Sequence, residues 1–243
     1  MYLIDQLTVV IVTYKTNKQI LDQCIKSILG KAKILIVENS YNKELKLSYE
    51  KNYPNLEVFL TGSNLGYGGG NNKGLSLVKT KYALISNPDV IYEEDFFNNL
   101  KTYIDEKTDF SIIGPLYRSN DYASHGYFDD LKNNKFQIDG LENESLIKTH
   151  WIVGCTMFIN LEKFENKKLF DENFFLFFEE FDLCRRVLKK GGKIYASKKL
   201  YVKHLGHKGS AIVDPKYEKE SNFLRSWHWM WSSFYYYEKN FSY

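Results

Sequence analysis

The sequence predicts an α/β fold in which a Rossmann-like, mostly parallel central sheet is flanked by helices, with an aromatic helix at the C-terminus. Short β-branched runs alternate with helical stretches through the first half of the chain, a pattern typical of βαβ units and parallel sheets. Of the 243 residues, 44% are hydrophobic and 26% charged, so the composition is globular and the length suits one sizeable domain.

The first half contains four predicted strands, at residues 7–13, 33–37, 56–60 and 82–86. Their helical connections show the usual start and stop signals of helices. The helices are expected from a capping box of Thr16 and Gln19 to about Leu29, after residues 38–40, through Val78 after a glycine-rich loop at 62–70, and from Glu93 and Glu94 onward.

The second half is less regular, and we expect it to complete the domain. Its predicted elements are strands at 110–117 and 151–160, a polar loop at 118–148, a helix at 179–190, and short strands at 193–196 and 200–204. Asp214 and Pro215 are expected to open a last helix, since Asp suits the N-cap and Pro the first turn.

Charge and cysteine content limit the partners and the compartment. The net charge of +3 is too mild for a nucleic-acid partner, which usually needs a concentrated basic stripe. Cysteines at positions 24, 155 and 184 form an odd set without metal-type spacing, which fits free thiols in a reducing compartment. No signal peptide and no apolar run of roughly 20 residues is found, so we expect a soluble or peripheral cytoplasmic protein.

Polar clusters follow all four strands of the first half. They are Thr13–Tyr14, Glu38–Asn39, Asn64–Asn72 and Asn87–Asp89. Because ligands of open α/β sheets bind beyond the carboxyl ends of the strands, these clusters predict a binding site at that edge.

Two of these clusters carry two interpretations each. In the stretch 64–74, glycines allow close approach to a ligand and a following helix N-terminus favours anions, but a tight strand–helix connection needs the same residues. Asp89 at a strand end can hold a divalent cation beside a diphosphate, whereas Asn87, Pro88 and Asp89 are also turn formers.

Acidic and imidazole groups in the second half are similarly ambiguous. The acidic cluster 179–182 follows an aromatic run, and apolar surroundings raise a carboxyl pKa toward values that suit a general base. Alternatively it is a capping cluster in which Asp182 pairs with Arg185 or Arg186. His204, followed three residues later by a second histidine, is either a metal or phosphate ligand or a structural residue.

Together these pieces resemble an inverting glycosyltransferase of family 2 with the GT-A fold, in the rhamnosyltransferase-like branch that builds bacterial surface polysaccharides. The resemblance spans residues 7 to about 210. It rests on seven motifs in the expected order: V-V-I-V-T-Y (9–14), E-N-S (38–40), N-L-G-Y-G-G-G-N-N-K-G (64–74), S-N-P-D-V (86–90), W-I-V-G-C (151–155), F-D-E-N-F-F-L-F-F-E-E-F-D-L-C-R-R (170–186) and H-L-G-H-K-G-S (204–210).

The resemblance implies a nucleotide-sugar site and a metal site. Asp89 would bind Mn²⁺ or Mg²⁺ as the last carboxylate of a D-x-D motif whose first position here is Asn87, and His204 would complete the metal or diphosphate contacts. Glu38 stands where the family usually has an Asp that contacts the base or ribose. The residues implied for the nucleotide sugar are Thr13, Tyr14, Glu38, Asn39, Asn64, Gly66, Asn71, Asn87, Gly154 and Cys155.

The resemblance also implies the chemistry and the partners. Glu180 stands where the family's catalytic Asp usually lies, in E-E-F-D instead of E-D-x-D, with Glu179 and Asp182 as fallback candidates. It would take the proton of an acceptor hydroxyl that attacks the donor sugar and inverts it in one displacement. The donor would be a nucleoside-diphosphate sugar, dTDP-rhamnose or a UDP-sugar, and the acceptor a saccharide or a polyprenyl-diphosphate-linked glycan.

The implied organisation has a catalytic domain and a terminal helix. Residues 1–212 would form the GT-A domain, with a nucleotide-binding half at 1–105 and an acceptor and catalytic half at 106–212, and 213–243 an amphipathic helix. An aromatic stripe on this helix predicts either packing against the catalytic domain or a second subunit, or contact through 215–240 with the inner face of the plasma membrane. The stripe comprises Phe223, Trp227, Met230, Trp231, Phe234 and Tyr237.

Two other functions stay open as alternatives, and a third is disfavoured. A sugar nucleotidyltransferase would need a glycine-rich, basic loop directly after the first strand, where residues 13–17 read T-Y-K-T-N. A non-catalytic nucleotide-sugar-binding module is compatible with the departures at Glu38, Asn87 and Glu180. A dehydrogenase is disfavoured because the glycine-rich stretch follows the third strand and not the first.

Overall fold

A computed structural model describes residues 2–118, 123–124, 145–206, 209 and 218–241. The first half comprises β1 (Leu7–Thr13), α1 (Lys18–Ile28), β2 (Lys33–Glu38), α2 (Lys43–Asn52), β3 (Leu56–Leu60), α3 (Gly66–Leu77), β4 (Tyr82–Ser86), β5 (Val90–Tyr92) and α4 (Phe96–Asp105). The second half comprises β6 (Ile112–Arg118), β7 (Ala123–Ser124), β8 (Leu146–Lys148), β9 (Thr156–Asn160), α5 (Glu179–Lys189), β10 (Ile194–His204) and α6 (Glu218–Phe241).

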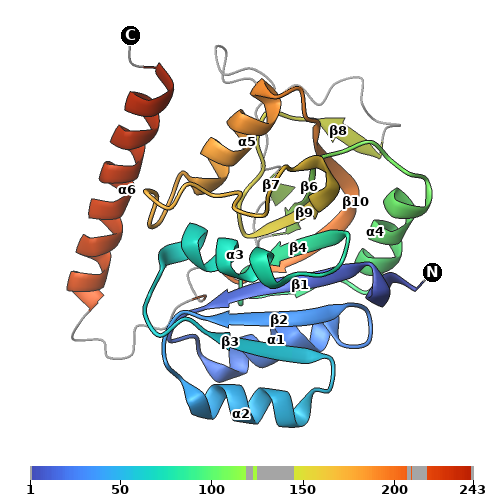
Figure 1. Cartoon of the computed structure of the whole chain (residues 1–243), viewed down its shortest axis with the longest axis horizontal. Helices are drawn as coiled ribbons and strands as arrows, with labels where there is room; N and C mark the ends of the chain where they lie inside the picture. Colours follow the sequence, from blue (N-terminus) through green and yellow to red (C-terminus); the bar gives the residue numbers. More distant parts are fainter. Residues whose placement is uncertain (1, 119–122, 125–144, 207–208, 210–217, 242–243) are drawn as a thin grey trace.

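One ten-stranded sheet runs through the molecule (Figure 1). Its main path has the order β3-β2-β1-β4-β9-β6-β10-β5, with β7 beside β6 and β8 beside β10. Strands β3, β2, β1 and β4 are parallel, as the βαβ pattern predicts. In the other half β9 is antiparallel to both β4 and β6, β10 is parallel to β6, and β5 is antiparallel to β10. The sheet is thus parallel across the first four predicted strands and mixed beyond them.

Helices cover both faces of the sheet. On one face α1 and α4 bury residues such as Ile25 and Leu100 in a cluster with Val9 of β1. On the other face α3 and α5 bury Leu75 and Leu183 in a cluster with Val10. Neighbouring residues of a strand point to opposite faces, so the continuous apolar run of β1 is that of a strand covered on both sides.

Helix α3 begins inside the stretch that the sequence analysis assigned to a glycine-rich loop. Gly66, with a φ of +74°, is its first residue, so residues 66–70 are helical and that assignment is wrong. A Cβ at Gly74 would overlap a methyl group of Val10, and one at Gly70 would come within 2.7 Å of Val12 Cγ1. The glycines therefore let α3 lie close against β1, which offsets their poor helix propensity.

The predicted capping box at the start of α1 is also wrong. Asn17 is the N-cap, and its side chain accepts a hydrogen bond from the Gln19 N–H at 2.8 Å. The Thr16 hydroxyl instead donates to the Gly209 carbonyl at 2.6 Å. This long-range bond joins Gly209 to the connection between β1 and α1.

Three further boundaries differ from expectation. Helix α4 begins at Phe96 and not at residues 93–94, because Val90–Tyr92 forms the edge strand β5. The strands predicted at 193–196 and 200–204 are one strand, β10, whose pairing is irregular between Ser197 and Tyr201. The strand predicted at 151–160 is shorter, since only β9 at its end joins the sheet.

Some predictions fall outside the described residues. They include most of the polar loop at 118–148, the helix start at Asp214 and Pro215, and the domain boundary between 212 and 213. The described ends of that loop carry β7 and β8.

Helix α6 lies along one side of the molecule (Figure 1). The face that it turns inward is not the one that its aromatic pattern suggested. Ser232 is fully buried and donates a hydrogen bond to the Leu176 carbonyl at 2.8 Å. The stripe residues Phe223, Phe234 and Tyr237 are 68%, 62% and 60% exposed. The expectation that the stripe packs against the catalytic domain is therefore wrong. Within the described chain, no helix has the length and apolar character that crossing a membrane requires.

Candidate active site

The polar ends of β1 and β2 meet because these strands are parallel and in register. Thr13 pairs with Glu38, and the Thr13 hydroxyl donates to Glu38 Oε2 at 2.6 Å. The Ser40 hydroxyl donates to Glu38 Oε1. Thr13 and Glu38 are buried, while Tyr14, the next residue of the chain, is half-buried at the rim. Two hydroxyls thus fix the Glu38 carboxylate at the floor of the predicted nucleotide site.

Three of the asparagines implied for the donor site, Asn39, Asn64 and Asn71, lie around the start of α3. Asn39 Nδ2 donates to the Gly66 carbonyl at 2.8 Å, and the Gly66 N–H donates to Asn64 Oδ1 at 3.0 Å. Asn71 Nδ2 donates to the Tyr67 carbonyl at 3.0 Å. Asn39 and Asn71 are buried, and neither side-chain oxygen has a hydrogen-bond donor among the described residues. Such unsatisfied buried acceptors are costly and are rare outside functional sites.

Asp89 and His204 come together through the pairing of β5 with β10. Val90 pairs with His204, the Leu205 N–H donates to the Asp89 carbonyl at 2.9 Å, and His204 Nε2 lies 3.3 Å from Asp89 Oδ1. Burial lowers the pKa of His204, but hydrogen bonds and charge from Asp89 and Cys155 outweigh it and raise that pKa to about 10. The two predicted metal residues, 115 positions apart in the chain, are therefore neighbours.

This pair fits a divalent cation. Asp89 is 2% exposed, so its carboxylate charge is held in a poorly solvated place that a cation would offset. A carboxylate oxygen and an imidazole nitrogen together suit Mn²⁺, and carboxylate oxygens also suit Mg²⁺. The residues that the structure describes contain no group of three or more His, Cys, Asp or Glu side chains able to hold a metal. Further ligands would come from a bound diphosphate and water.

The antiparallel strand β9 brings a second segment to the carboxyl end of β4. Ser86 pairs with Thr156, and the Asn87 N–H donates to the Cys155 carbonyl at 2.8 Å. A Cβ added to Gly154 would lie 3.4 Å from Glu180 Cβ. Gly154 thus borders Glu180, while Cys155 borders the Asp89–His204 pair.

Glu179 and Glu180 begin α5, after a short segment with unusual backbone geometry. We call residues 171–178 the catalytic loop. Phe177 and Phe178, its last two residues, have φ values of +71° and +67°. Bulky residues rarely adopt this left-handed region, which costs about 1–3 kcal/mol per residue and often marks functional sites. After these two left-handed residues, α5 begins beside Gly154.

The first two residues of α5 are carboxylates that differ in their exposure to water. Glu179 is 2% exposed, and its Oε1 has no hydrogen-bond donor among the described residues. Burial and then the charge of Glu180 raise the pKa of Glu179 well above its ordinary value. Burial also raises the pKa of the half-buried Glu180, although the N–H groups of Glu180 and Gly154 favour its charged form. A raised pKa suits a group that accepts a proton near neutral pH.

Asp182 differs from the two glutamates because its charge is already paired. Its side chain is fully buried, and Arg186 Nε donates to its Oδ2 at 2.7 Å. Lys239 Nζ of α6 lies 2.7 Å from its Oδ1. The pairing with Arg186 was one of the two predicted. Arg185 instead lies over the Phe241 ring of α6 at 4.2 Å.

Sequence reasoning missed two members of this cluster. The Tyr67 hydroxyl donates to the Gly154 carbonyl, and burial together with the charges of Glu180 and Glu179 raises the pKa of Tyr67 well above its ordinary value. Tyr67 lies in the N-L-G-Y motif, but only the fold shows that it reaches Gly154. Lys239 lies 57 residues from Asp182, with no motif to connect them.

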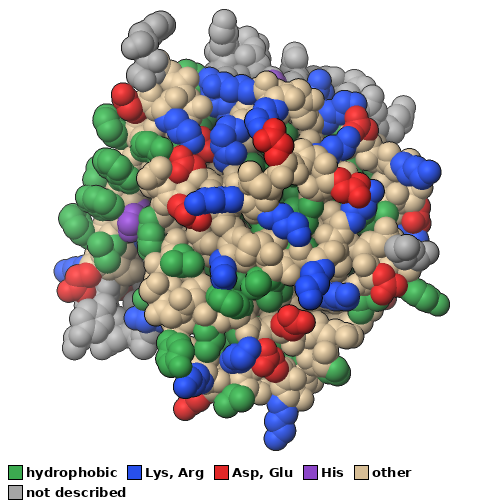
Figure 2. All heavy atoms as spheres, in the orientation of Figure 1, with side chains coloured by type: hydrophobic (Ala, Val, Ile, Leu, Met, Phe, Trp, Pro, Cys, Tyr) green, Lys and Arg blue, Asp and Glu red, His purple; other side chains and the backbone are tan. Residues whose placement is uncertain are grey.

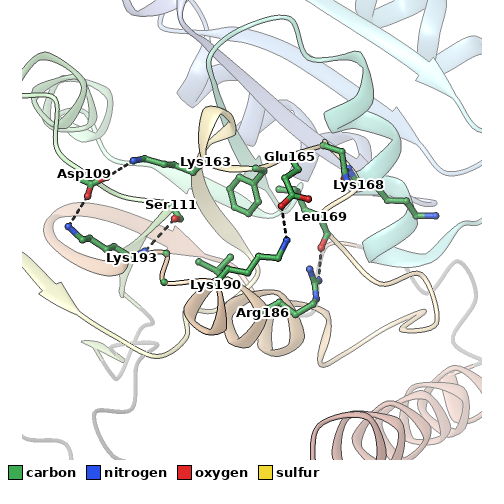
Figure 3. A pocket seen from close by; sticks show the side chains of 14 residues that line it. Asp109, Ser111, Lys163, Glu165, Lys168, Leu169, Arg186, Lys190 and Lys193 are labelled. Atoms are coloured by element: carbon green, nitrogen blue, oxygen red, sulfur yellow. Dashed lines mark hydrogen bonds and ion pairs between the residues drawn. The ribbon is translucent and has the colours of Figure 1, made fainter.

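One hollow among the described residues lies away from this site. It has a volume of about 400 Å³ and surrounds the C-terminal end of α5, away from Glu179 and Glu180 (Figure 3). Its basic side chains are all paired: Lys163 and Lys193 with Asp109, Lys190 with Glu165, Lys168 with Glu172 and Arg186 with Asp182. The described side chains of this hollow therefore offer no unpaired positive charge to a ligand.

Comparison with known proteins shows the family of the chain. Residues 8–167 match the model of glycosyl transferase family 2. That match covers well over half of the chain, which therefore belongs to this family. It ends before α5 and β10, so Glu179, Glu180 and His204 lie beyond it.

Two relatives with assigned names are glycosyltransferases. The low-salt glycan biosynthesis hexosyltransferase Agl10 of Haloferax volcanii is 27% identical over 198 residues, which cover 77% of this chain and 63% of that protein. The rhamnosyltransferase WbbL of Escherichia coli K12 is 25% identical over 195 residues, covering 72% of this chain and 73% of that one. The chain thus spans less than two thirds of the length of Agl10.

Solved structures share the fold. GalNAc-T7 with UDP, GalNAc and Mn²⁺ superposes with a TM-score of 0.66 at 14% identity, over 83% of this chain and 44% of that one. Staphylococcus aureus TarS 1–349 with UDP-GlcNAc gives a TM-score of 0.61 at 14% identity, over 92% and 66% of the two chains. At this identity the likeness shows the fold alone, which is the GT-A glycosyltransferase fold.

The burial of Glu179 makes a prediction about stability. A carboxyl whose pKa is raised in the folded state contributes stability below its unfolded pKa, and loses that contribution as pH rises through the folded pKa. The variant Glu179→Gln removes this loss. We expect its free energy of unfolding relative to the native protein to increase from pH 4 to pH 8 by more than about 1 kcal/mol.

Chemical denaturation at several pH values measures this difference. Glu57→Gln, which changes an exposed carboxylate of β3, is the matched control, and its difference should change less with pH than that of Glu179→Gln. A Glu179→Gln difference that does not change with pH would mean that the carboxyl is not held in an apolar environment.

Proposed function

We propose that this family 2 protein is a metal-dependent inverting glycosyltransferase that moves a sugar from a nucleoside diphosphate to an acceptor hydroxyl. The single observation that carries this proposal is the position of Gly154 and Cys155. Gly154 borders Glu180, and Cys155 borders the Asp89–His204 pair. A proton acceptor and a cation site thus flank one two-residue segment, at the edge of the sheet where the polar strand ends gather.

The donor would lie along the carboxyl ends of the parallel strands. The half-buried Tyr14 at the rim and the fixed carboxylate of Glu38 support a nucleoside there, with Asn39, Asn64 and Asn71 at the start of α3. The relatives and the structural neighbours support a sugar nucleotide as the ligand class. We propose a dTDP- or UDP-linked sugar, with rhamnose favoured by the WbbL likeness.

Asp89 and His204 would hold the divalent cation. When bound, the cation offsets negative charge that develops on the leaving diphosphate.

Glu180 would serve as the base. Its carboxylate would take the proton of the acceptor hydroxyl as that oxygen attacks the anomeric carbon, while the bond from that carbon to the diphosphate oxygen breaks. Attack from the face opposite the leaving group inverts the configuration. Glu180 is favoured over its neighbours because Glu179 is fully enclosed and Asp182 is already paired with Arg186 and Lys239.

Two substitutions test these roles against a matched control. We expect Asp89→Asn and Glu180→Gln each to reduce release of nucleoside diphosphate by about 10²- to 10⁴-fold in a panel of dTDP- and UDP-sugars with Mn²⁺ or Mg²⁺. Asp89→Asn should also abolish the metal-dependent thermal shift with nucleotide, while Glu180→Gln should keep it. Glu162→Gln, on an exposed turn, should behave as the native protein.

Activity that survives both substitutions would contradict the site. Nucleotide binding by the native protein without turnover of any donor would instead favour a non-catalytic binding module.

We also propose that the exposed face of α6 rests on a membrane surface, where lipid-linked acceptors would be presented. Hydrophobic side chains gather along the side of the molecule where α6 lies (Figure 2). Arg225 is the one charged residue of positions 221–237, and it lies over the Phe177 ring on the inward side. An uncharged face rich in Trp, Tyr and Phe suits the interface between headgroups and acyl chains.

Vesicle sedimentation tests this surface. With vesicles of phosphatidylethanolamine and phosphatidylglycerol, Phe234→Glu should weaken binding at least tenfold, whereas Asn222→Glu, a charge added on another exposed side of α6, should change it little. No binding by the native protein, together with a dimer that Phe234→Glu dissociates, would mean that a second copy covers this face.

A further inference from the structure

The inward face of α6 contacts the catalytic loop along most of its length. The Ser232 hydroxyl donates to the Leu176 carbonyl at 2.8 Å. The His228 ring stacks on Phe175 with centroids 4.7 Å apart, and the Tyr235 ring packs on Phe174 at 4.9 Å. Helix α6 is therefore the support on which this loop lies.

The strained end of the loop is also enclosed by α6. The Phe178 ring packs against Trp229 and Tyr236 of α6, at 6.1 and 5.5 Å between centroids, and against Phe181 of α5 at 5.4 Å. Left-handed backbone at a bulky residue persists only where the surroundings enforce it. At Phe178, the last residue before Glu179 and Glu180, much of that enforcement comes from α6.

Lys239 joins the two ends of the loop. Its Nζ lies 2.8 Å from Asp171 Oδ2, at the first residue, and 2.7 Å from Asp182 Oδ1, in the first turn of α5. The Asp182 N–H donates in turn to the Phe178 carbonyl at 3.0 Å. Because Arg186 binds the other oxygen of Asp182, the two cations together neutralise a carboxylate that has no exposure to water.

We propose that Lys239 is a positioning residue, which locks α6 onto both ends of the catalytic loop and so holds Glu180 in its working orientation. The inference rests on the proposed role of Glu180. Lys239 itself acts through Asp171 and Asp182 and not on the substrate.

Hydrogen exchange of backbone amides tests this role without a substrate. In Lys239→Met, we expect amides of residues 174–182 to exchange at least about tenfold faster than in the native protein, while β1 and β4 keep their rates. Lys239→Arg should restore most of the protection. Lys219→Met, which removes an exposed lysine at the other end of α6, is the matched control. If Lys239→Met does not fold, Ser232→Ala tests whether docking of α6 holds the loop, because it removes the hydrogen bond from α6 to the Leu176 carbonyl.

Unchanged exchange in the loop would overturn the proposal. The kinetic counterpart uses the donor that the native protein turns over fastest. Lys239→Met should lower kcat at least tenfold with little change in the donor KM, and a loss confined to KM would also overturn it. A native protein without transfer activity would contradict the proposed function, whereas the exchange result would still decide whether Lys239 holds the loop.

Discussion

The antiparallel pairing of β9 with β4 is the constraint on which the candidate site depends. In a parallel pair, the residues before β9 would lie at the far edge of the sheet. With Ser86 opposite Thr156, the chain that enters β9 instead lies beside the chain that leaves β4. Gly154 and Cys155 therefore lie at the same edge of the sheet as Asp89. There Gly154 contacts Glu180 at the start of α5. One register thus brings together groups from opposite halves of the chain.

Close packing by glycine is the second requirement. Gly66 and Gly74 let α3 approach both the catalytic loop and β1, because a side chain at either position would overlap its neighbours. At Gly66 that neighbour is the Phe175 carbonyl, which also accepts the Tyr67 N–H at 3.0 Å. The same helix that closes the core therefore helps to place Tyr67 and the loop that leads to Glu180.

The parallel half of the fold could be predicted from the sequence because each of its signals is local. The β-branched run of β1 and the polar residues after it, such as Thr13, are visible without a partner. The three-residue strand β5 was not predicted because it is too short for a local signal, and the direction of β9 could not be predicted because it depends on pairing across the sheet. Asn17 capped α1 in place of Thr16 because Thr16 bonds to Gly209, a contact 193 residues away.

The residues of the candidate site also divide into those that the sequence could locate and those that only the fold shows. Asp89 and Glu180 stand in motifs that a family resemblance can locate. Lys239 could not be found, since its pairing with Asp182 exists only once α6 docks. The aromatic stripe of α6 was visible, but its periodicity does not say which side is buried. The inward face carries polar and aromatic residues such as Ser232 and Tyr235, so hydrophobicity alone indicated the wrong side.

The proposed role of Glu180 requires a single displacement at the anomeric carbon of the donor sugar. Proton NMR of the sugar that is first released when the native protein hydrolyses its donor, observed before the anomers equilibrate, measures this outcome. We predict that the released sugar has the anomeric configuration opposite to that of the donor. Release with the donor's configuration retained would contradict a single displacement and the role of Glu180 as its base.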